Sequence, residues 1–194
     1  YLAGGYKGVP NIAGQHGTNQ SGSPSQGSTD AFLAKLNTIG DVYWISTGGG
    51  NGDDYASNIT ADNNGNVYAS HIFSGSANFG TFNVATVAQW GSAWGRINPA
   101  DGSYNWVNYT NAPSGTGGGI VTDNAGYIYF IGSFQGIKTF RSSGSGFNPS
   151  ISANGGYDLY IAKYKSDGNL CWVKNYGGSG DEYSNRSLMR YDRL

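Results

Sequence analysis

The sequence predicts an all-β protein built from about three copies of a four-stranded antiparallel unit, the blade of a β-propeller. The first observation is composition: 33 glycines and 14% aromatic residues among 194, with many short apolar runs, are typical of strands joined by tight turns. The second is an internal repeat with a period of about 61 to 67 residues. The third is that no segment shows a convincing helical period longer than two turns.

The repeat is visible in two kinds of segment. The stretch "NNGNVYASHIFSG" at 63–75 returns as "NAGYIYFIGSFQG" at 124–136, and the chain begins with the related "YLAGGYKG". The segment 30–44 returns at 91–106 and 158–172, and each copy ends in a tryptophan four residues after a glycine. A repeat of this kind indicates one structural unit stacked several times, because a single unit cannot bury both of its faces.

Each period contains four expected strands. The first precedes an Asp-x-x-Gly turn, and a loop rich in Gly, Ser and Asn separates the second from the third. The second and third strands alternate as half-buried strands do, and the turns place Gly or Asn where φ must be positive. The first strand is expected within 57–65 and 117–126, and the second within 66–73 and 127–134. The third is expected within 31–37 and 159–165, and the fourth within 41–47 and 169–176.

The charge balance excludes several classes of function. Charged residues are 12% of the chain and the net charge is −1, which gives no electrostatic case for nucleic acid or an anionic membrane. No apolar run is long enough to span a membrane, and a single cysteine excludes a disulfide within the chain. Nothing in the sequence points to a cofactor.

The pattern D-A-F-L-A-K-L, followed by a Trp, by G-G-x-G-D-D-Y and by D-x-x-G-N-V-Y, resembles the bacterial β-propeller repeat called the SBBP repeat. The resemblance covers residues 30–75 and 117–183. It is weaker in the middle copy, where Gly91 replaces the leading Asp. It implies a secreted or cell-surface bacterial protein, of a kind that in Bacteroidetes is often exported by type IX secretion, and it implies no shared catalytic residues.

Three repeats are fewer than a closed propeller needs, since closed rings typically have four to eight blades. The repeat units are expected at about 1–67, 68–128 and 129–194, with the chain starting and ending inside a unit. We therefore expect a segment of a ring of about six to eight blades. Further blades or oligomerisation would close that ring.

Acidic residues in two Gly-rich loops are weak candidates for a metal site, because carboxylate oxygens bind calcium. The middle copy lacks these acids, and the spacing of a known calcium loop is missing. We therefore expect them to bond to backbone amides in turns, with no calcium requirement. The four residues are Asp53, Asp54, Asp181 and Glu182.

Two groups of aromatic residues have different expected roles. The fixed phase of Trp44, Trp106 and Trp172 in the repeat predicts that they pack between blades, and Trp172 in particular is expected to be buried. A second group lies in the divergent middle copy and is a weak candidate for an exposed surface that stacks on sugars, with repacking of an irregular blade as the alternative. This group is Trp90, Trp94, Tyr104 and Tyr109.

The only two histidines, His16 and His71, have no partners at the spacing of a catalytic or metal site. His16 is expected to be solvated and His71 to be a structural strand residue. Without a catalytic constellation, the sequence predicts a non-catalytic module for protein binding, cell-surface interaction or assembly. Two alternatives stay open: a propeller-type glycoside hydrolase or lyase with catalytic residues in further blades, and a glycan-binding module.

Overall fold

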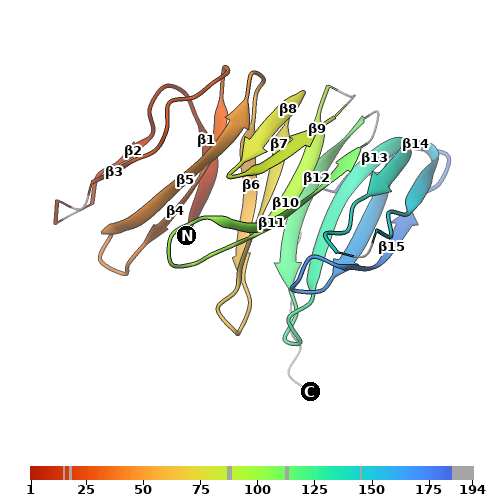
Figure 1. Cartoon of the computed structure of the whole chain (residues 1–194). Coiled ribbons are helices and arrows are strands. Elements are labelled where there is room, and N and C mark those ends of the chain that lie inside the picture. The colour runs from red at the N-terminus through yellow and green to blue at the C-terminus, as the bar shows by residue number, and fades with distance from the viewer. Residues whose placement is uncertain (15, 18, 87–88, 112–113, 145, 185–194) are drawn as a thin grey trace.

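The computed structural model describes residues 1–14, 16–17, 19–86, 89–111, 114–144 and 146–184 (Figure 1). These residues form β-strands and no helix, which confirms the all-β prediction. No helix that could cross a membrane is therefore found in the described ranges. The strands are β1 (Leu2–Tyr6), β2 (Asn11–Ile12), β3 (Gln20–Ser21), β4 (Asp30–Leu36), β5 (Val42–Gly50), β6 (Tyr55–Ala61), β7 (Val67–Phe73), β8 (Ser76–Phe79), β9 (Phe82–Ala85), β10 (Gly91–Ile97), β11 (Tyr104–Asn111), β12 (Ser114–Thr122), β13 (Ile128–Phe140), β14 (Ser150–Tyr164) and β15 (Leu170–Tyr176).

The strands form a five-stranded sheet of order β1-β4-β5-β8-β9, an eight-stranded sheet of order β15-β14-β13-β11-β10-β7-β6 with β12 paired to β13, and the separate pair β2-β3. Within these sheets, three antiparallel groups of strands, here called units, follow one another along the chain. Unit 1 has the order β1-β4-β5, unit 2 has β6-β7-β10-β11, and unit 3 has β12-β13-β14-β15. Figure 1 shows them side by side, with unit 1 at one end and unit 3 at the other. The second, third and fourth strands of the repeat thus pair in every unit. The turns of the repeat contain the expected positive-φ glycines, such as Gly65 and Gly126 between first and second strands and Gly168 between third and fourth.

Two connections that the repeat did not predict tie the units together. The hairpin β8–β9 lies between β7 and β10 of unit 2, yet β8 pairs with Gly48–Gly50 at the end of β5 in unit 1. The far end of β13 continues past its own unit, and Phe140 pairs with Thr110 of β11. Each unit is therefore hydrogen-bonded to the next as well as packed against it.

The hydrophobic core consists of two clusters, each between neighbouring units. The first joins buried residues of unit 1, such as Leu33 and Trp44, to residues of unit 2 such as Phe73. The second joins Trp94 of unit 2 to Phe130 of unit 3, and their rings stack with centroids 4.3 Å apart. Because strand side chains alternate between two faces, the middle unit contributes one face to each cluster.

A tryptophan–turn contact repeats at both interfaces. The indole Nε1 of Trp44 donates to the Pro99 carbonyl oxygen at 3.2 Å, and that of Trp106 donates to the Ser166 carbonyl oxygen at 3.1 Å. Each acceptor lies in the hairpin turn of the next unit. A Cβ atom on Gly102 would come within 2.6 Å of the Trp44 ring, so only glycine lets the ring reach the turn.

The expectation that Trp172 is buried is wrong. Trp44 and Trp106 are 6% and 8% exposed, whereas Trp172 is 38% exposed on the outer face of unit 3. The physical reason is that burial of this position requires the hairpin turn of a following unit, and no such turn lies over it in the part of the chain that the structure describes. Trp172 has the same position in the repeat as Trp44 and Trp106, but it lacks the covering turn that they have among the described residues.

His71 is a buried strand residue, as expected. It is 0% exposed, its ring stacks on Phe79 with centroids 4.3 Å apart, and its Nε2 lies 2.9 Å from the hydroxyl of Tyr104. Burial lowers the pKa of His71 to about 3, so the imidazole is neutral in the folded protein.

Candidate functional site

A polar cavity of about 130 Å³ opens beside the start of β4. Its walls come from β1, from the loop 23–26, from the end of β5 and from the β8–β9 hairpin that reaches across from unit 2. The cavity is much smaller than a pocket for a drug-sized molecule, which takes about 300 to 1,000 Å³. It therefore has room for one side group of a larger ligand. We call it the Asp30 pocket.

Asp30 is the residue that gives this pocket its chemistry. Asp30 is the first residue of β4 and is only 2% exposed. One carboxylate oxygen, Oδ2, accepts the backbone N–H of Gln26 at 3.0 Å. The other, Oδ1, is buried and has no hydrogen-bond partner among the described residues. A buried acceptor without a partner is costly, so this atom is poised to accept a hydrogen bond from a ligand.

The neighbours of Asp30 fix the place of its carboxylate. Tyr6 lies opposite it in the β1–β4 register, and the Tyr6 hydroxyl donates to the Ser23 carbonyl oxygen at 2.9 Å. On the other side, a Cβ atom on Gly49 would come within 2.6 Å of the Asp30 carboxyl carbon. Glycine at position 49 therefore makes room for the carboxylate.

Two further acids from the predicted list lie near this pocket. Asp54 is fully buried: its Oδ2 accepts the Gly50 N–H at 2.8 Å and its Oδ1 accepts the Ser74 N–H at 3.2 Å. Burial, together with the negative charges of Asp30 and Asp53, raises the pKa of Asp54 to about 6. Asp53 carries a buried Oδ1 without a partner in the described structure. The pocket therefore lies in a region of negative potential.

The raised pKa of Asp54 predicts a pH dependence of stability. Because the folded pKa lies above the ordinary value of 3.8, the stabilisation from protonating Asp54 is fully present below pH 4 and is lost as pH rises through 6. We expect the free energy of unfolding of the wild type, minus that of Asp54→Asn, to fall between pH 4 and pH 7 in denaturant melts.

Asp101→Asn is the matched control for this measurement. Asp101 is exposed, and hydrogen bonds from Ser103 lower its pKa, so its contribution is lost as pH falls rather than as pH rises. A difference between wild type and Asp54→Asn that stayed constant from pH 4 to pH 7 would contradict the assignment.

The other units show what happens to the same position elsewhere. In unit 3, Asp158 repeats the arrangement: its Oδ2 accepts the Asn154 N–H at 3.0 Å and its Oδ1 is buried without a partner in the described residues. In unit 2, Gly91 replaces the aspartate, and the ring of Phe73 lies within 2.5 Å of where its Cβ would be. The middle unit thus replaces a polar site with apolar packing.

The remaining acidic candidates contact backbone amides. Asp181 Oδ1 accepts the Tyr157 N–H at 2.8 Å, and Glu182 Oε2 accepts the Gly178 N–H at 3.1 Å. Within the described ranges, no group of three or more His, Cys, Asp or Glu side chains is arranged to hold a metal ion.

The four aromatic candidates do not form an exposed surface. Trp94 is completely buried between units 2 and 3, so its expected exposure is corrected. The hydroxyl of Tyr104 bonds to buried His71, and Tyr109 is half-buried beneath the guanidinium of Arg141, 4.7 Å from its ring centroid. Trp90 is half-buried, 6.5 Å from the ring of Tyr55. Trp94 and Tyr104 are therefore packing residues, and sugar stacking by Trp90 and Tyr109 stays a prediction.

Sequence reasoning missed Asp30 as a site residue. The available signal was an aspartate that begins the third strand in two of the three copies, at a position where the strand becomes buried. A buried carboxylate at the start of a strand needs compensating donors, and a count of those donors requires the structure.

No protein-family model matches the chain, and no curated protein matches its sequence significantly.

Proposed function

We propose that the chain is a run of β-propeller blades from a secreted or surface-exposed bacterial protein, and that it acts as a non-catalytic binding module for a protein partner. Two complete four-stranded antiparallel units, and a tryptophan–turn contact that repeats at both interfaces between units, support the propeller. The resemblance of residues 30–75 and 117–183 to SBBP repeats supports the location.

The observation that carries the binding role is that Asp30 lines the pocket while its buried Oδ1 has no hydrogen-bond partner among the described residues. A carboxylate oxygen accepts hydrogen bonds and favours a cationic donor, most strongly where further carboxylates lie near. Asp53 and Asp54 are the further carboxylates near Asp30. A primary ammonium group, such as a lysine side chain of a protein partner, matches both the size and the charge of the site.

The test is an NMR titration of the isotope-labelled chain with methylammonium and, separately, with a methyl glucoside. We expect methylammonium to shift the backbone amide resonances of Thr47, Gly48 and Gly49, which line the pocket. Asp30→Asn should abolish the shifts, because it removes the charge at nearly constant volume. Asp101→Asn, an exposed acid outside the pocket, should leave them unchanged.

The other outcomes decide between the readings. Shifts with the glucoside alone would replace the amine site by a glycan-binding module, since a sugar hydroxyl is a neutral donor. No shift with either probe would show that the pocket binds neither class of ligand and would overturn the proposed site.

A further inference from the structure

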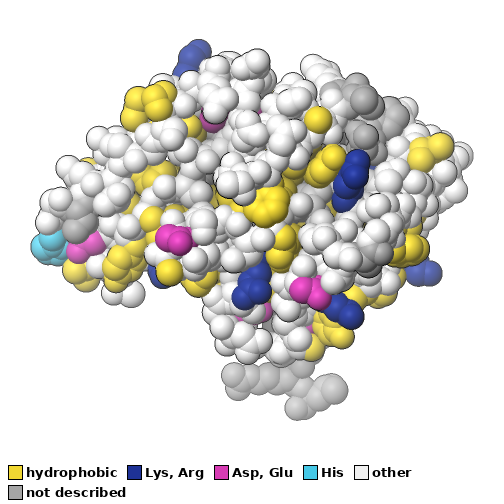
Figure 2. Space-filling view, in the orientation of Figure 1, with side chains coloured by type: hydrophobic (Ala, Val, Ile, Leu, Met, Phe, Trp, Pro, Cys, Tyr) yellow, Lys and Arg dark blue, Asp and Glu magenta, His cyan; other side chains and the backbone are white. Residues whose placement is uncertain are grey.

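Two positions that the neighbouring unit covers on unit 2 are exposed on the outer face of unit 3. Trp172 occupies the position of Trp106, and Tyr176 occupies that of Thr110. In unit 2 these two positions are 8% and 0% exposed, whereas in unit 3 they are 38% and 54% exposed. Hydrophobic and basic side chains reach the surface at the end formed by β14 and β15 (Figure 2). Among the described residues, no unit covers these two positions of unit 3, although they are covered in unit 2.

The two interfaces within the chain show what such a face binds. At the first, Trp44 Nε1 and Lys35 Nζ both donate to the Pro99 carbonyl oxygen, at 3.2 and 2.7 Å. At the second, Trp106 donates to the carbonyl oxygen of Ser166. Both acceptors are the second residue of a hairpin turn that closes on a positive-φ glycine. Unit 3 repeats the tryptophan as Trp172 and the lysine as Lys163, which face each other in the β14–β15 register. The Lys163 Nζ also lies 3.9 Å from the Asp123 carboxylate, so Trp172 is the donor that the proposal depends on.

Unit 1 has a hairpin turn with a positive-φ glycine, like the turns that accept the tryptophans of units 1 and 2. In the turn 37–41, Gly40 has φ +89°, and Thr38 corresponds to Ser166 of unit 3. Thr38 is exposed, and Ile39 is 54% exposed. The tip of this turn is thus open to a partner.

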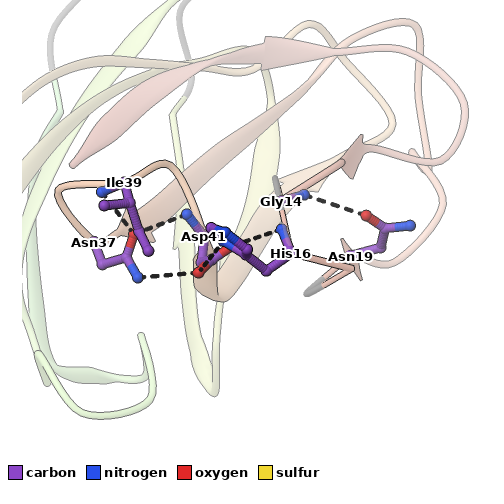
Figure 3. Close-up of polar contacts among 6 residues, drawn as sticks. All are labelled: Gly14, His16, Asn19, Asn37, Ile39 and Asp41. Atoms are coloured by element: carbon purple, nitrogen blue, oxygen red, sulfur yellow. Dashed lines mark hydrogen bonds and ion pairs between the residues drawn. The ribbon is translucent and has the colours of Figure 1, made fainter.

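The turn is held in shape by its own contacts and by the preceding loop (Figure 3). Asn37 Oδ1 accepts the backbone N–H groups of Ile39 and Asp41, at 3.0 and 2.8 Å. The Asp41 carboxylate accepts the backbone N–H of His16 at 3.0 Å and pairs with its ring at 3.2 Å. A turn organised before binding loses little entropy when it docks.

We propose that the outer face of unit 3 binds unit 1 of a second copy of this chain, head to tail. Trp172 packs on Gly40 of the second copy, and Trp172 Nε1 and Lys163 Nζ donate to its Thr38 carbonyl oxygen. Both complementary parts belong to this chain and lie at opposite ends of the three units (Figure 1). The contact is heterologous, so repeated docking forms either a closed ring or an open chain of copies.

The first measurement is the sedimentation of the chain over a concentration series from about 1 to 500 µM, a range that spans weak to moderate association. We expect the average mass to rise with concentration. Trp172→Ala should raise the dissociation constant about ten-fold or more, as expected for a central aromatic contact. Tyr55→Ala, which removes an aromatic residue of the same 38% exposure from the middle unit, is the control and should have no such effect.

The second variant tests the other side of the contact. Gly40→Asn adds a side chain where the Trp172 ring is to pack, and asparagine tolerates a positive φ. The matched control is Gly65→Asn, at a glycine of φ +78° with open space around it. Circular dichroism and thermal melts show whether each variant is folded, so a loss of association is not confused with unfolding.

Mixing the two variants is the decisive experiment. The Gly40→Asn chain keeps its Trp172 face, and the Trp172→Ala chain keeps its turn, so an equimolar mixture should form a heterodimer although each variant alone is a monomer. A wild type that stays monomeric throughout, a Trp172→Ala chain that associates like the wild type, or a mixture that forms no heterodimer would overturn the proposal. The proposal does not depend on the Asp30 pocket, and Asp30→Asn should leave association unchanged.

Discussion

Replacing Lys138 with methionine should stabilise the protein by about 3 kcal/mol at pH 7. Lys138 lies on β13, is only 1% exposed, and its Nζ lies 5.1 Å from the centre of the Tyr160 ring. Burial lowers its pKa to about 7, against an ordinary value of 10.5. A shift of this size costs about 4 kcal/mol at pH 7, at 1.36 kcal/mol per pH unit, and loss of the contact with Tyr160 offsets about 1 kcal/mol. Methionine fills a similar volume without a charge.

The sign of the pH dependence distinguishes this effect from simple repacking. Because the folded pKa lies below the unfolded one, the stability is fully present above pH 10.5 and is lost as pH falls toward 7. Guanidinium melts at pH 7 and pH 9.5 should show the advantage of Lys138→Met shrinking at the higher pH. Lys7→Met, at an exposed lysine, should change neither value. A Lys138→Met variant less stable than the wild type at pH 7 would show that the amine is compensated in the folded protein.

Truncation of Trp94 to alanine should destabilise the protein by about 3 to 5 kcal/mol, the usual cost of removing a buried aromatic side chain. Trp94 is 0% exposed, stacks on Phe130, and meets Tyr164 edge-on with centroids 5.2 Å apart. Both contacts cross the interface between units 2 and 3, so removal of the Trp94 side chain weakens the packing between the two units.

The control variants for Trp94 separate packing from hydrogen bonding. Its Nε1 is buried without a partner among the described residues, so Trp94→Phe removes no hydrogen bond and should cost clearly less than alanine. Tyr43→Ala, at an aromatic residue that is 59% exposed, should cost less than about 1 kcal/mol. The free energies of unfolding are to be measured in urea melts. A loss for Trp94→Ala as small as that for Tyr43→Ala would contradict the burial of Trp94.

The strands could be predicted from the sequence because their signals are local. Period-two alternation and Asp-x-x-Gly turns depend on a few neighbouring residues, and the resulting β6, β7, β12 and β15 lie where those signals placed them. The β8–β9 hairpin was not predicted, since its pairing partner β5 belongs to another unit and no local pattern specifies it.

The candidate site shows the same limit. The leading aspartates of two copies are plain in the sequence, yet Asp30 becomes a site only because the loop 23–26 and the β8–β9 hairpin enclose it while leaving one oxygen unpaired. Trp94 was expected at the surface because no other copy has tryptophan there. Its position faces unit 3, where Phe130 and Tyr164 cover it.

The repeat, the all-β class and the phase of the three tryptophans follow from the amino-acid sequence alone. Which of the tryptophans are buried depends on how the units pack: Trp44 and Trp106 meet the turn of a following unit, and Trp172 meets no such turn among the described residues. The physical reason is that alternation sets the face on which a side chain lies, whereas burial depends on what packs against that face. Packing partners come from distant parts of the chain, or from another chain, and no local pattern encodes them.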